Sequence, residues 1–393
     1  MRQLKPNIYY VGAIDWDRRL FDELIPLPDG TSYNAYLIRG SEKTALLDTV
    51  DPTRAETLIG NLVKAGIEKI DYVVAHHAEQ DHSGAIPDVL LLYPDAKVVV
   101  TPKCKGMLID LLDISEDRFI TVEDGEHLSL GDKTLQFVYI PWVHWPETMG
   151  TYLQEDKIFF PCDFFGSHFA TSSLFVDNEP VVYEAAKRYY AEIMMPFRTA
   201  IQNNLQKVEE LDIEIIAPSH GPIYDRPEFI TDAYKDWVSD NVKNQVVLPY
   251  ISMHGSTGKM VEYFVDALIE RDITVKQFNL SVADVGELAM ALVDAATIVL
   301  GCPTVLTGAH PKVAYAAILA NALRPKTKFV SIIGSYGWGG KMVEQLKGLI
   351  PNLKVELFTP VVAKGYPKDE DFAALEKLAD EILVGHKGLG ITD

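Results

Sequence analysis

The second part of the chain alternates regularly between short apolar runs and helical stretches, and this order limits the possible folds more than any other feature of the sequence. Five strand–helix units in a row fold as a doubly wound parallel sheet with right-handed crossovers. Strands are predicted near residues 245–251, 273–279, 296–301, 328–334 and 354–359. Helices are predicted near residues 257–270, 284–294, 311–323, 340–349 and 369–384.

The first part of the chain has apolar runs separated by polar turns and helical stretches. Runs of this kind are typical of buried strands, although a buried helix gives a similar signal. Several of them end on His, Asp or Glu, and α/β sheets usually carry their chemistry just beyond strand ends. The predicted strands are residues 43–49, 71–76, 97–101, 134–141, 157–163 and 213–218.

The length of 393 residues indicates two domains, because single domains mostly contain roughly 100 to 200 residues. The two patterns meet in the polar stretch 236–244. We therefore predict an α/β protein with domains at residues 1–242 and 243–393.

Charge and cysteine content exclude several classes of protein. A formal net charge of -20 opposes a nucleic-acid backbone, and no Lys/Arg stripe overcomes it locally. Cys104, Cys162 and Cys302 form no CxxC pair, so we expect buried thiols and no structural zinc, iron–sulfur cluster or appended rubredoxin. The N-terminus lacks a signal-peptide core, and no apolar run approaches the roughly 20 residues that span a bilayer. A cytoplasmic protein without nucleic-acid or membrane partners is expected.

Seven dispersed polar residues form a candidate metal constellation. His77, Glu79, Asp81 and His82 follow the predicted strand 71–76, and such a cluster alone is often only a solvated turn. Three further residues follow or adjoin apolar runs, where an unpartnered polar group would be costly. These residues are His144, Asp163 and His220.

The composition of this set indicates two cations that share a carboxylate. Four imidazoles and three carboxylates suit iron or manganese as well as zinc. Sites richer in histidine favour zinc more strongly, so Glu79 favours iron without deciding the question.

The order His-x-Glu-x-Asp-His followed by His, Asp and His resembles the diiron site of flavodiiron proteins, also called A-type flavoproteins. The resemblance implies an N-terminal metallo-β-lactamase-like αββα sandwich over residues 1–242 and a flavodoxin-like, FMN-binding domain over residues 243–393. In zinc hydrolases of the first fold, the position of Glu79 is normally histidine. By the same resemblance, one iron takes His77, Glu79 and His144, the other takes Asp81, His82 and His220, and Asp163 bridges them.

Three loops are candidates for FMN binding. The turn 252–257 precedes a predicted helix, whose backbone N–H groups and dipole can hold a phosphate. The other two follow the third and fourth strands, where a flavodoxin holds its ring, although Leu306 and Thr307 replace two asparagines common in the family. The candidate residues are Ser252, Met253, His254, Gly255, Ser256, Thr257, Pro303, Thr304, Val305, Leu306, Thr307, Gly308, Ser335, Tyr336, Gly337, Trp338, Gly339 and Gly340.

The remaining histidines and one tryptophan are given supporting roles. His76 is expected to pack or to hydrogen-bond, and His168 is close enough to Asp163 to orient a ligand. Trp145 either lines a gas pocket or belongs to the core. His127 and His386 are interpreted as surface residues.

The resemblance implies an oxidoreductase that reduces dioxygen to water with electrons relayed through FMN. Motifs such as Cys162-Asp163-Phe164-Phe165-Gly166 look like the methanogen branch, which implies reduced coenzyme F-420 as the donor. The family resemblance also implies a head-to-tail homodimer, or a dimer of dimers. The alternatives are a nitric oxide reductase with rubredoxin or another small electron-transfer protein as donor, and a zinc hydrolase with a C-terminal module that binds no flavin.

Overall fold

The computed structural model describes residues 1–392, and they divide into two compact units. The first contains residues 1–190 and 197–238, and the second contains residues 191–196 and the chain from Ser239 onward. The main division, between Val238 and Ser239, lies in the polar stretch 236–244.

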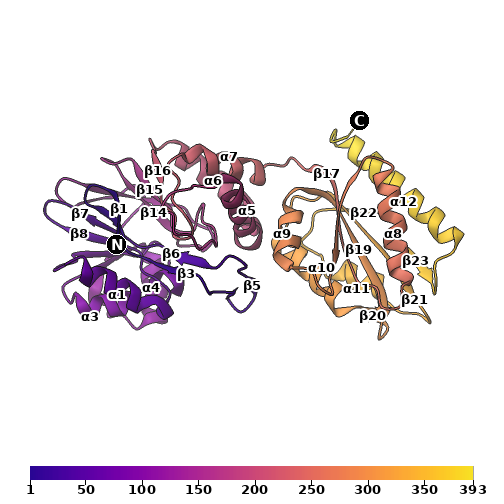
Figure 1. Cartoon of the computed structure of the whole chain (residues 1–393), viewed down its shortest axis with the longest axis horizontal. Helices are drawn as coiled ribbons and strands as arrows, with labels where there is room; N and C mark the ends of the chain where they lie inside the picture. The colour runs from indigo at the N-terminus through magenta and orange to yellow at the C-terminus, as the bar shows by residue number, and fades with distance from the viewer. Residues whose placement is uncertain (393) are drawn as a thin grey trace. The chain divides into compact units, whose positions relative to one another are not determined.

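The first unit is built on two sheets (Figure 1). The seven-stranded sheet has the order β1 (Arg2–Lys5), β2 (Ile8–Tyr10), β7 (Tyr36–Arg39), β8 (Thr44–Leu47), β9 (Tyr72–Val74), β10 (Lys97–Val100) and β11 (Phe119–Thr121). The five-stranded sheet has the order β12 (His127–Ser129), β13 (Thr134–Tyr139), β14 (Met149–Leu153), β15 (Ile158–Phe160) and β16 (Ile215–Ile216). Two short hairpin-like pairs stand apart: β3 (Ala13–Asp15) with β6 (Thr31–Tyr33), and β4 (Leu20–Phe21) with β5 (Ile25–Pro26).

The two sheets pack face to face and helices cover them. Alternate residues of β8 point to opposite sides: Ala45 and Leu47 join Phe137 and Phe160 between the sheets, and Leu46 joins the core beneath the helices. The helices over the first sheet are α1 (Ala55–Lys64), α3 (Ile86–Leu92) and α4 (Pro102–Leu112). Those beside the second are α5 (Glu179–Tyr189), α6 (Arg198–Glu209) and α7 (Pro227–Val238).

Local sequence explains where α4 begins. The Thr101 hydroxyl accepts a hydrogen bond from the Cys104 N–H at 3.1 Å, and Pro102 occupies the first turn, so α4 starts at that point. Short elements complete the unit: α2 (Gln80–Ser83) and 3-10 turns at Pro52–Arg54 and Glu116–Arg118. A π-helical turn at Tyr190–Met194 and a 3-10 turn at Met195–Phe197 lie mostly in residues 191–196, which belong to the second unit.

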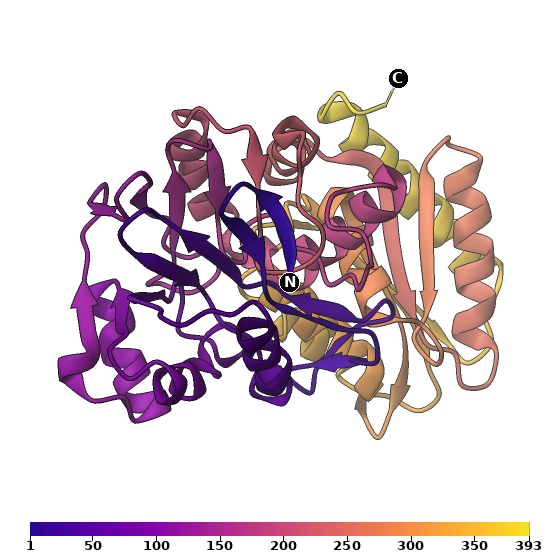
Figure 2. The same cartoon turned by 60° about the vertical axis from the view of Figure 1, so that its left-hand side comes forward.

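The second unit is a parallel sheet with the order β18 (Thr274–Asn279), β17 (Lys243–Tyr250), β19 (Ala295–Val305), β21 (Phe329–Tyr336) and β22 (Glu356–Leu357). β23 (Val361–Lys364) also pairs with β21 in parallel, and β20 (Gly308–Ala309) pairs antiparallel with β19. Helices α8 (Ser256–Ile269) and α12 (Asp369–Gly388) lie on one face (Figures 1 and 2). On the other lie α9 (Val285–Asp294), α10 (Pro311–Leu323) and α11 (Met342–Gly348).

This architecture confirms the predicted αββα sandwich followed by a doubly wound parallel sheet. The three cysteines are free and buried, as predicted. Among the described residues, no helix is both long enough and apolar enough to cross a membrane.

The prediction for His386 was wrong. Its side chain lies on the buried side of α12 and is fully buried. Its Nε2 lies 2.8 Å from the Thr297 hydroxyl, and its Nδ1 lies 2.7 Å from Asn244 Oδ1. His386 continues the buried stripe of Leu378 and Ile382 at helical spacing, so the helix period contained the signal.

Candidate metal centre and flavin pocket

The seven predicted ligands lie at strand ends of both sheets in the first unit. His77 and Glu79 follow β9, and Glu79 is the residue immediately before α2, which carries Asp81 and His82. From the second sheet, His144 lies between β13 and β14, Asp163 follows β15, and His220 follows β16. The strand order therefore brings residues far apart in sequence to one edge of the sandwich.

Four of these residues form the first donor set. The donor atoms of His77, Glu79, His144 and Asp163 all lie within 4.8 Å of one another. Glu79 Oε2 is 3.1 Å from Nε2 of both His77 and His144. Asp163 Oδ2 is 3.2 Å from His77 Nε2 and 3.3 Å from His144 Nε2.

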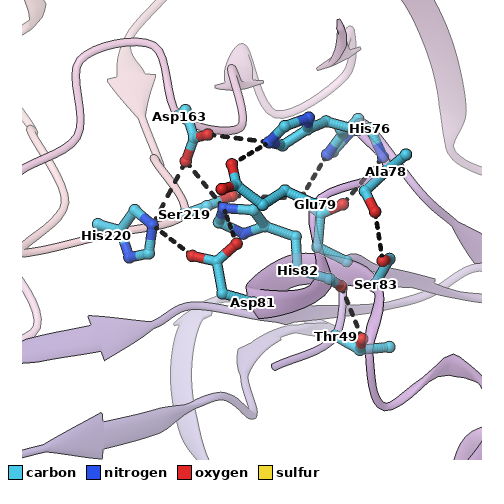
Figure 3. A network of polar contacts seen from close by, with 12 residues as sticks. Thr49, His76, Ala78, Glu79, Asp81, His82, Ser83, Asp163, Ser219 and His220 are labelled. Atoms are coloured by element: carbon cyan, nitrogen blue, oxygen red, sulfur yellow. Dashed lines mark hydrogen bonds and ion pairs between the residues drawn. The ribbon is translucent and has the colours of Figure 1, made fainter. Parts of the chain in front are cut away.

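Asp163 turns its other oxygen to a second donor set of Asp81, His82 and His220 (Figure 3). Its Oδ1 is 2.9 Å from His82 Nε2 and 3.4 Å from His220 Nε2. Asp81 completes the set, with Oδ2 at 3.2 Å from His220 Nε2. The structure thus brings all seven residues together with one carboxylate shared between the two sets.

The buried histidines and carboxylates of the site shift one another's pKa values. Burial alone lowers the pKa of His82, but the carboxylates of Asp163 and Asp81 outweigh this effect and raise that pKa to about 9. His144 behaves alike: burial is outweighed by Asp163 and Glu79, and its pKa rises to about 9. Burial raises the pKa of Glu79, yet hydrogen bonds from His144 and His77 hold it below its usual value.

The arrangement fits metal ions better than it fits a hydrogen-bond network. Both oxygens of Asp81, both ring nitrogens of His82 and Oδ1 of Asp163 are buried without a hydrogen-bond partner, although they approach one another closely. Buried polar groups are normally paired, and a cation between these atoms would satisfy them. Nitrogen and carboxylate donors in this number suit two ions such as iron.

The supporting residues surround this site. His76 is no donor to it, because its ring nitrogens lie 2.7 Å from Asp48 Oδ2 and from the Thr151 hydroxyl. The His168 ring packs on His220, with centroids 4.8 Å apart. The ring of Trp145 packs edge-on against His77 at 5.0 Å, in contact with the proposed ligands.

Sequence reasoning missed Glu147 and Ser32, which contact His77 and His220 from behind, and Asp48, which pairs with His76. The Ser32 carbonyl accepts a hydrogen bond from His220 Nδ1 at 2.6 Å. Asp48 has a detectable signal, since it is an acidic residue next to the last position of the predicted strand 43–49. Glu147 had none, because it stands in a polar turn beside Pro146.

A pocket of about 180 Å³ opens at the carboxyl ends of β17, β19 and β21 in the second unit. The three predicted loops supply most of its lining. It is lined by Met253, His254, Ser256, Thr257, Pro303, Thr304, Ser335, Tyr336, Gly337 and Gly365. Gly365 was not predicted; it follows β23, a strand that the sequence analysis overlooked, and its N–H donates to the Tyr336 carbonyl at 2.8 Å.

The remaining predicted FMN residues do not line this pocket. Val305 and Gly308 pair as the ends of a β-hairpin, and Leu306 at its tip is 91% exposed. The hairpin therefore directs this segment into solvent. Trp338, Gly339 and Gly340 lie past the lining residue Gly337, and Trp338 is 80% exposed. Ser252 lies behind the turn, where its Oγ accepts a hydrogen bond from the Gly258 N–H at 3.0 Å.

The start of α8 suits a phosphate. Gly255 precedes the helix with a φ of +88° and has no side chain that could cap it. Ser252 Oγ accepts from the Gly258 N–H, which leaves the N–H groups of Ser256 and Thr257 without a side-chain acceptor in the described part of the chain. Uncapped N–H groups at a helix N-terminus attract anions. The Thr257 hydroxyl lies 2.9 Å from Ser335 Oγ, which connects the turn to the loop after β21. The pocket thus places the start of α8, which would suit an anion, beside the side chain of Tyr336.

Comparison with known proteins identifies relatives along nearly the whole chain. A family model described as ODP family beta lactamase matches residues 31–221. The chain is 36% identical to a nitric oxide reductase of Moorella thermoacetica, over 96% of each protein. It is 32% identical to a coenzyme F-420 H2 oxidase of Methanothermobacter marburgensis, over 97% of this chain and 98% of the relative.

Solved structures give the same result. Rubredoxin oxygen:oxidoreductase from Desulfovibrio gigas superposes with a TM-score of 0.94 at 29% identity, covering 98% of both chains. The flavodiiron protein from Giardia intestinalis superposes with a TM-score of 0.87 at 26% identity, covering 98% of this chain and 96% of the other. With these similarities over both units, the chain belongs to the flavodiiron (A-type flavoprotein) family of oxidoreductases.

Proposed function

We propose that this protein reduces dioxygen to water at a diiron site, with electrons relayed through FMN. The observation that carries the proposal is the pair of donor sets sharing Asp163, in the same chain as an anion-ready pocket at a flavodoxin-type switch point. A zinc hydrolase has no use for the second feature. The similarity to a rubredoxin oxygen:oxidoreductase supports dioxygen as the substrate.

The chain's own residues hold and shield the cofactors. His77, Glu79 and His144 would hold one iron, Asp81, His82 and His220 the other, and Asp163 both. A reduced iron pair supplies two electrons and reduced FMN two more, which matches the demand of one dioxygen molecule. His77, Asp163 and His220 are each at most 1% exposed, so bulk water has little access around the ligands.

Nitric oxide is the second candidate substrate, because the relative with 36% identity is a nitric oxide reductase. Two nitric oxide molecules need only two electrons, which the same cofactors could deliver.

The electron donor is proposed to be reduced coenzyme F-420, in line with the relative that is a coenzyme F-420 H2 oxidase. Rubredoxin is the alternative, in line with the Desulfovibrio gigas protein. We further propose a head-to-tail homodimer, alone or doubled into a tetramer, in which the FMN of one subunit serves the diiron site of the other. A cytoplasmic location remains a prediction from the sequence.

The test is anaerobic reduction of the protein with each donor in turn, followed by exposure to dioxygen or nitric oxide. Flavin reoxidation should be much faster in iron-loaded protein than in the same protein stripped of iron by a chelator. Equal rates in the two samples would refute the oxidase. Faster reoxidation by nitric oxide than by dioxygen would select the alternative substrate.

A visible spectrum and metal analysis separate both redox functions from the zinc hydrolase. Bound flavin absorbs at about 450 nm, a general property of the cofactor. A purified protein that contains zinc and lacks this band would support the hydrolase.

A further inference from the structure

Glu147 is a buried carboxylate behind the first donor set. It lies between His144 and β14 and is 3% exposed. Its Oε1 accepts a hydrogen bond from the Ala78 N–H at 3.0 Å and lies 3.4 Å from His77 Nδ1. Its Oε2 is buried without a partner. An unpaired carboxylate oxygen in such surroundings indicates that positive charge belongs nearby.

The contact determines which nitrogen of His77 carries the proton. Nε2 of His77 faces the carboxylates of Glu79 and Asp163 inside the donor set. Nδ1 faces Glu147, which can only accept when ionised. The proton therefore sits on Nδ1 and leaves the Nε2 lone pair free for a metal ion.

The second donor set has no comparable anion behind its histidines among the described residues. The Nδ1 atom of His220 faces the neutral carbonyl of Ser32, and Nδ1 of His82 has no hydrogen-bond partner. The nearby carboxylate of Asp48 is already paired with His76 at 2.7 Å. The two halves of the centre thus differ by one negative charge behind the ligands.

The charge count supports a role for this fourth carboxylate. Glu79, Asp81 and Asp163 carry three negative charges against the four positive charges of two divalent ions. Glu147 makes the sum zero, and a buried site is most stable when its charges are compensated.

We propose that Glu147 is a positioning residue that fixes the Nδ1–H form of His77 and makes the iron on the His77 side the more electron-rich of the pair. This inference rests on the proposed function only in requiring iron at the seven ligands. A more electron-rich iron has a lower reduction potential, so this iron is oxidised first and the two irons are inequivalent.

The decisive variant is Glu147→Gln, since glutamine keeps an oxygen that can accept from Ala78 and His77 but removes the charge. We expect iron to bind roughly 10- to 100-fold more weakly. In protein loaded with excess iron, one of the two iron potentials should rise while the other stays, and the EPR spectrum of the mixed-valent form should change. Glu155→Gln, which neutralises an exposed carboxylate on the same unit, is the matched control and should match wild type.

Glu147→Asp keeps the charge and should recover much of the wild-type potential and affinity. FMN content and circular dichroism report whether each variant is folded. Unchanged iron affinity, potentials and EPR spectrum in Glu147→Gln would overturn the inference. Equal loss in Glu147→Gln and Glu147→Asp would also overturn it, since the role would then be one of shape. Wild-type protein that binds no iron would instead disprove the proposed function.

Discussion

His144 has the most accessible side chain among the seven proposed ligands, at 15% exposure, so its removal disturbs packing least. We predict that His144→Ala lowers iron affinity by roughly 100-fold or more and abolishes turnover. The first donor set loses one of its nitrogen donors, and no other residue replaces it. FMN content should stay at the wild-type level. Iron analysis, the flavin spectrum and gas-consumption assays measure the three quantities.

The control for this variant is His127→Ala, which removes an exposed histidine of β12. It should bind iron and turn over like wild type. Turnover retained in His144→Ala would disprove the ligand role of this residue.

At the level of single residues, sequence predicts polar groups at strand ends well and residues behind them poorly. His144, Asp163 and His220 stand out because each is polar beside an apolar run. Glu147 reaches His77 only because the β13–β14 connection folds back over the strand end after β9, and this return is a tertiary contact. Local pattern cannot contain such information.

Helix α12 is anchored through His386, and this anchor should make stability depend on pH. Burial lowers the pKa of His386 from 6.5 to about 4. The unfolded chain therefore binds a proton that the folded chain does not between these values, and folding loses free energy as the pH falls from about 6.5 to about 4. Above pH 6.5 the contribution is complete.

We predict that His386→Ala lowers the unfolding free energy at pH 7.5 by about 1–3 kcal/mol, since Thr297 and Asn244 lose their partner. Between pH 6.5 and 4 its stability should decline less steeply than that of wild type. Denaturant unfolding at several pH values measures both effects, with His127→Ala as reference. Parallel pH curves for His386→Ala and wild type would contradict the assignment.

The start of α8 can be tested with a charge. Ser256 lines the pocket at the first helical position. A carboxylate there interacts favourably with the helix dipole and so stabilises the helix, but it repels a phosphate. Ser256→Glu should therefore keep the protein folded and weaken FMN binding by roughly 100-fold, or about 3 kcal/mol. The neutral, equally large Ser256→Gln should weaken it much less. Equal FMN affinities in flavin titrations of the two variants would show that no phosphate binds here.

At the level of elements, long periodic segments were predicted most closely. The predicted helices 257–270 and 311–323 correspond to α8 (Ser256–Ile269) and α10 (Pro311–Leu323). The strand β14 was missed because Met149–Leu153 is buried on both faces and contains Gly150 and Thr151, so it shows neither alternation nor a continuous apolar run. Sheet order and register depend on contacts distant in sequence, and only the fold-family resemblance could supply them.

At the level of the whole molecule, the proposed dimer predicts complementation between two inactive chains. His144→Ala should lack working iron, and Ser256→Glu should carry little FMN when free FMN is kept well below its weakened Kd. In a head-to-tail mixed dimer, the FMN of the first chain faces the diiron site of the second, so one complete centre forms. Random exchange yields about half mixed dimers with one of two centres working, hence about a quarter of wild-type turnover.

Turnover should be measured after the two variants are co-expressed, with each variant alone as the blank. Light scattering gives the oligomeric state in the same samples. A mixed sample as inactive as the blanks, although mixed dimers are present, would mean that electrons pass within one chain.

Asp163 presents one oxygen to each donor set, and this division has a consequence for how the protein acquires iron. The first ion to arrive would order the side chain that the second ion also requires. We therefore expect this ordering to favour cooperative filling, so that at limiting supply fully loaded and empty chains outnumber those that hold a single ion.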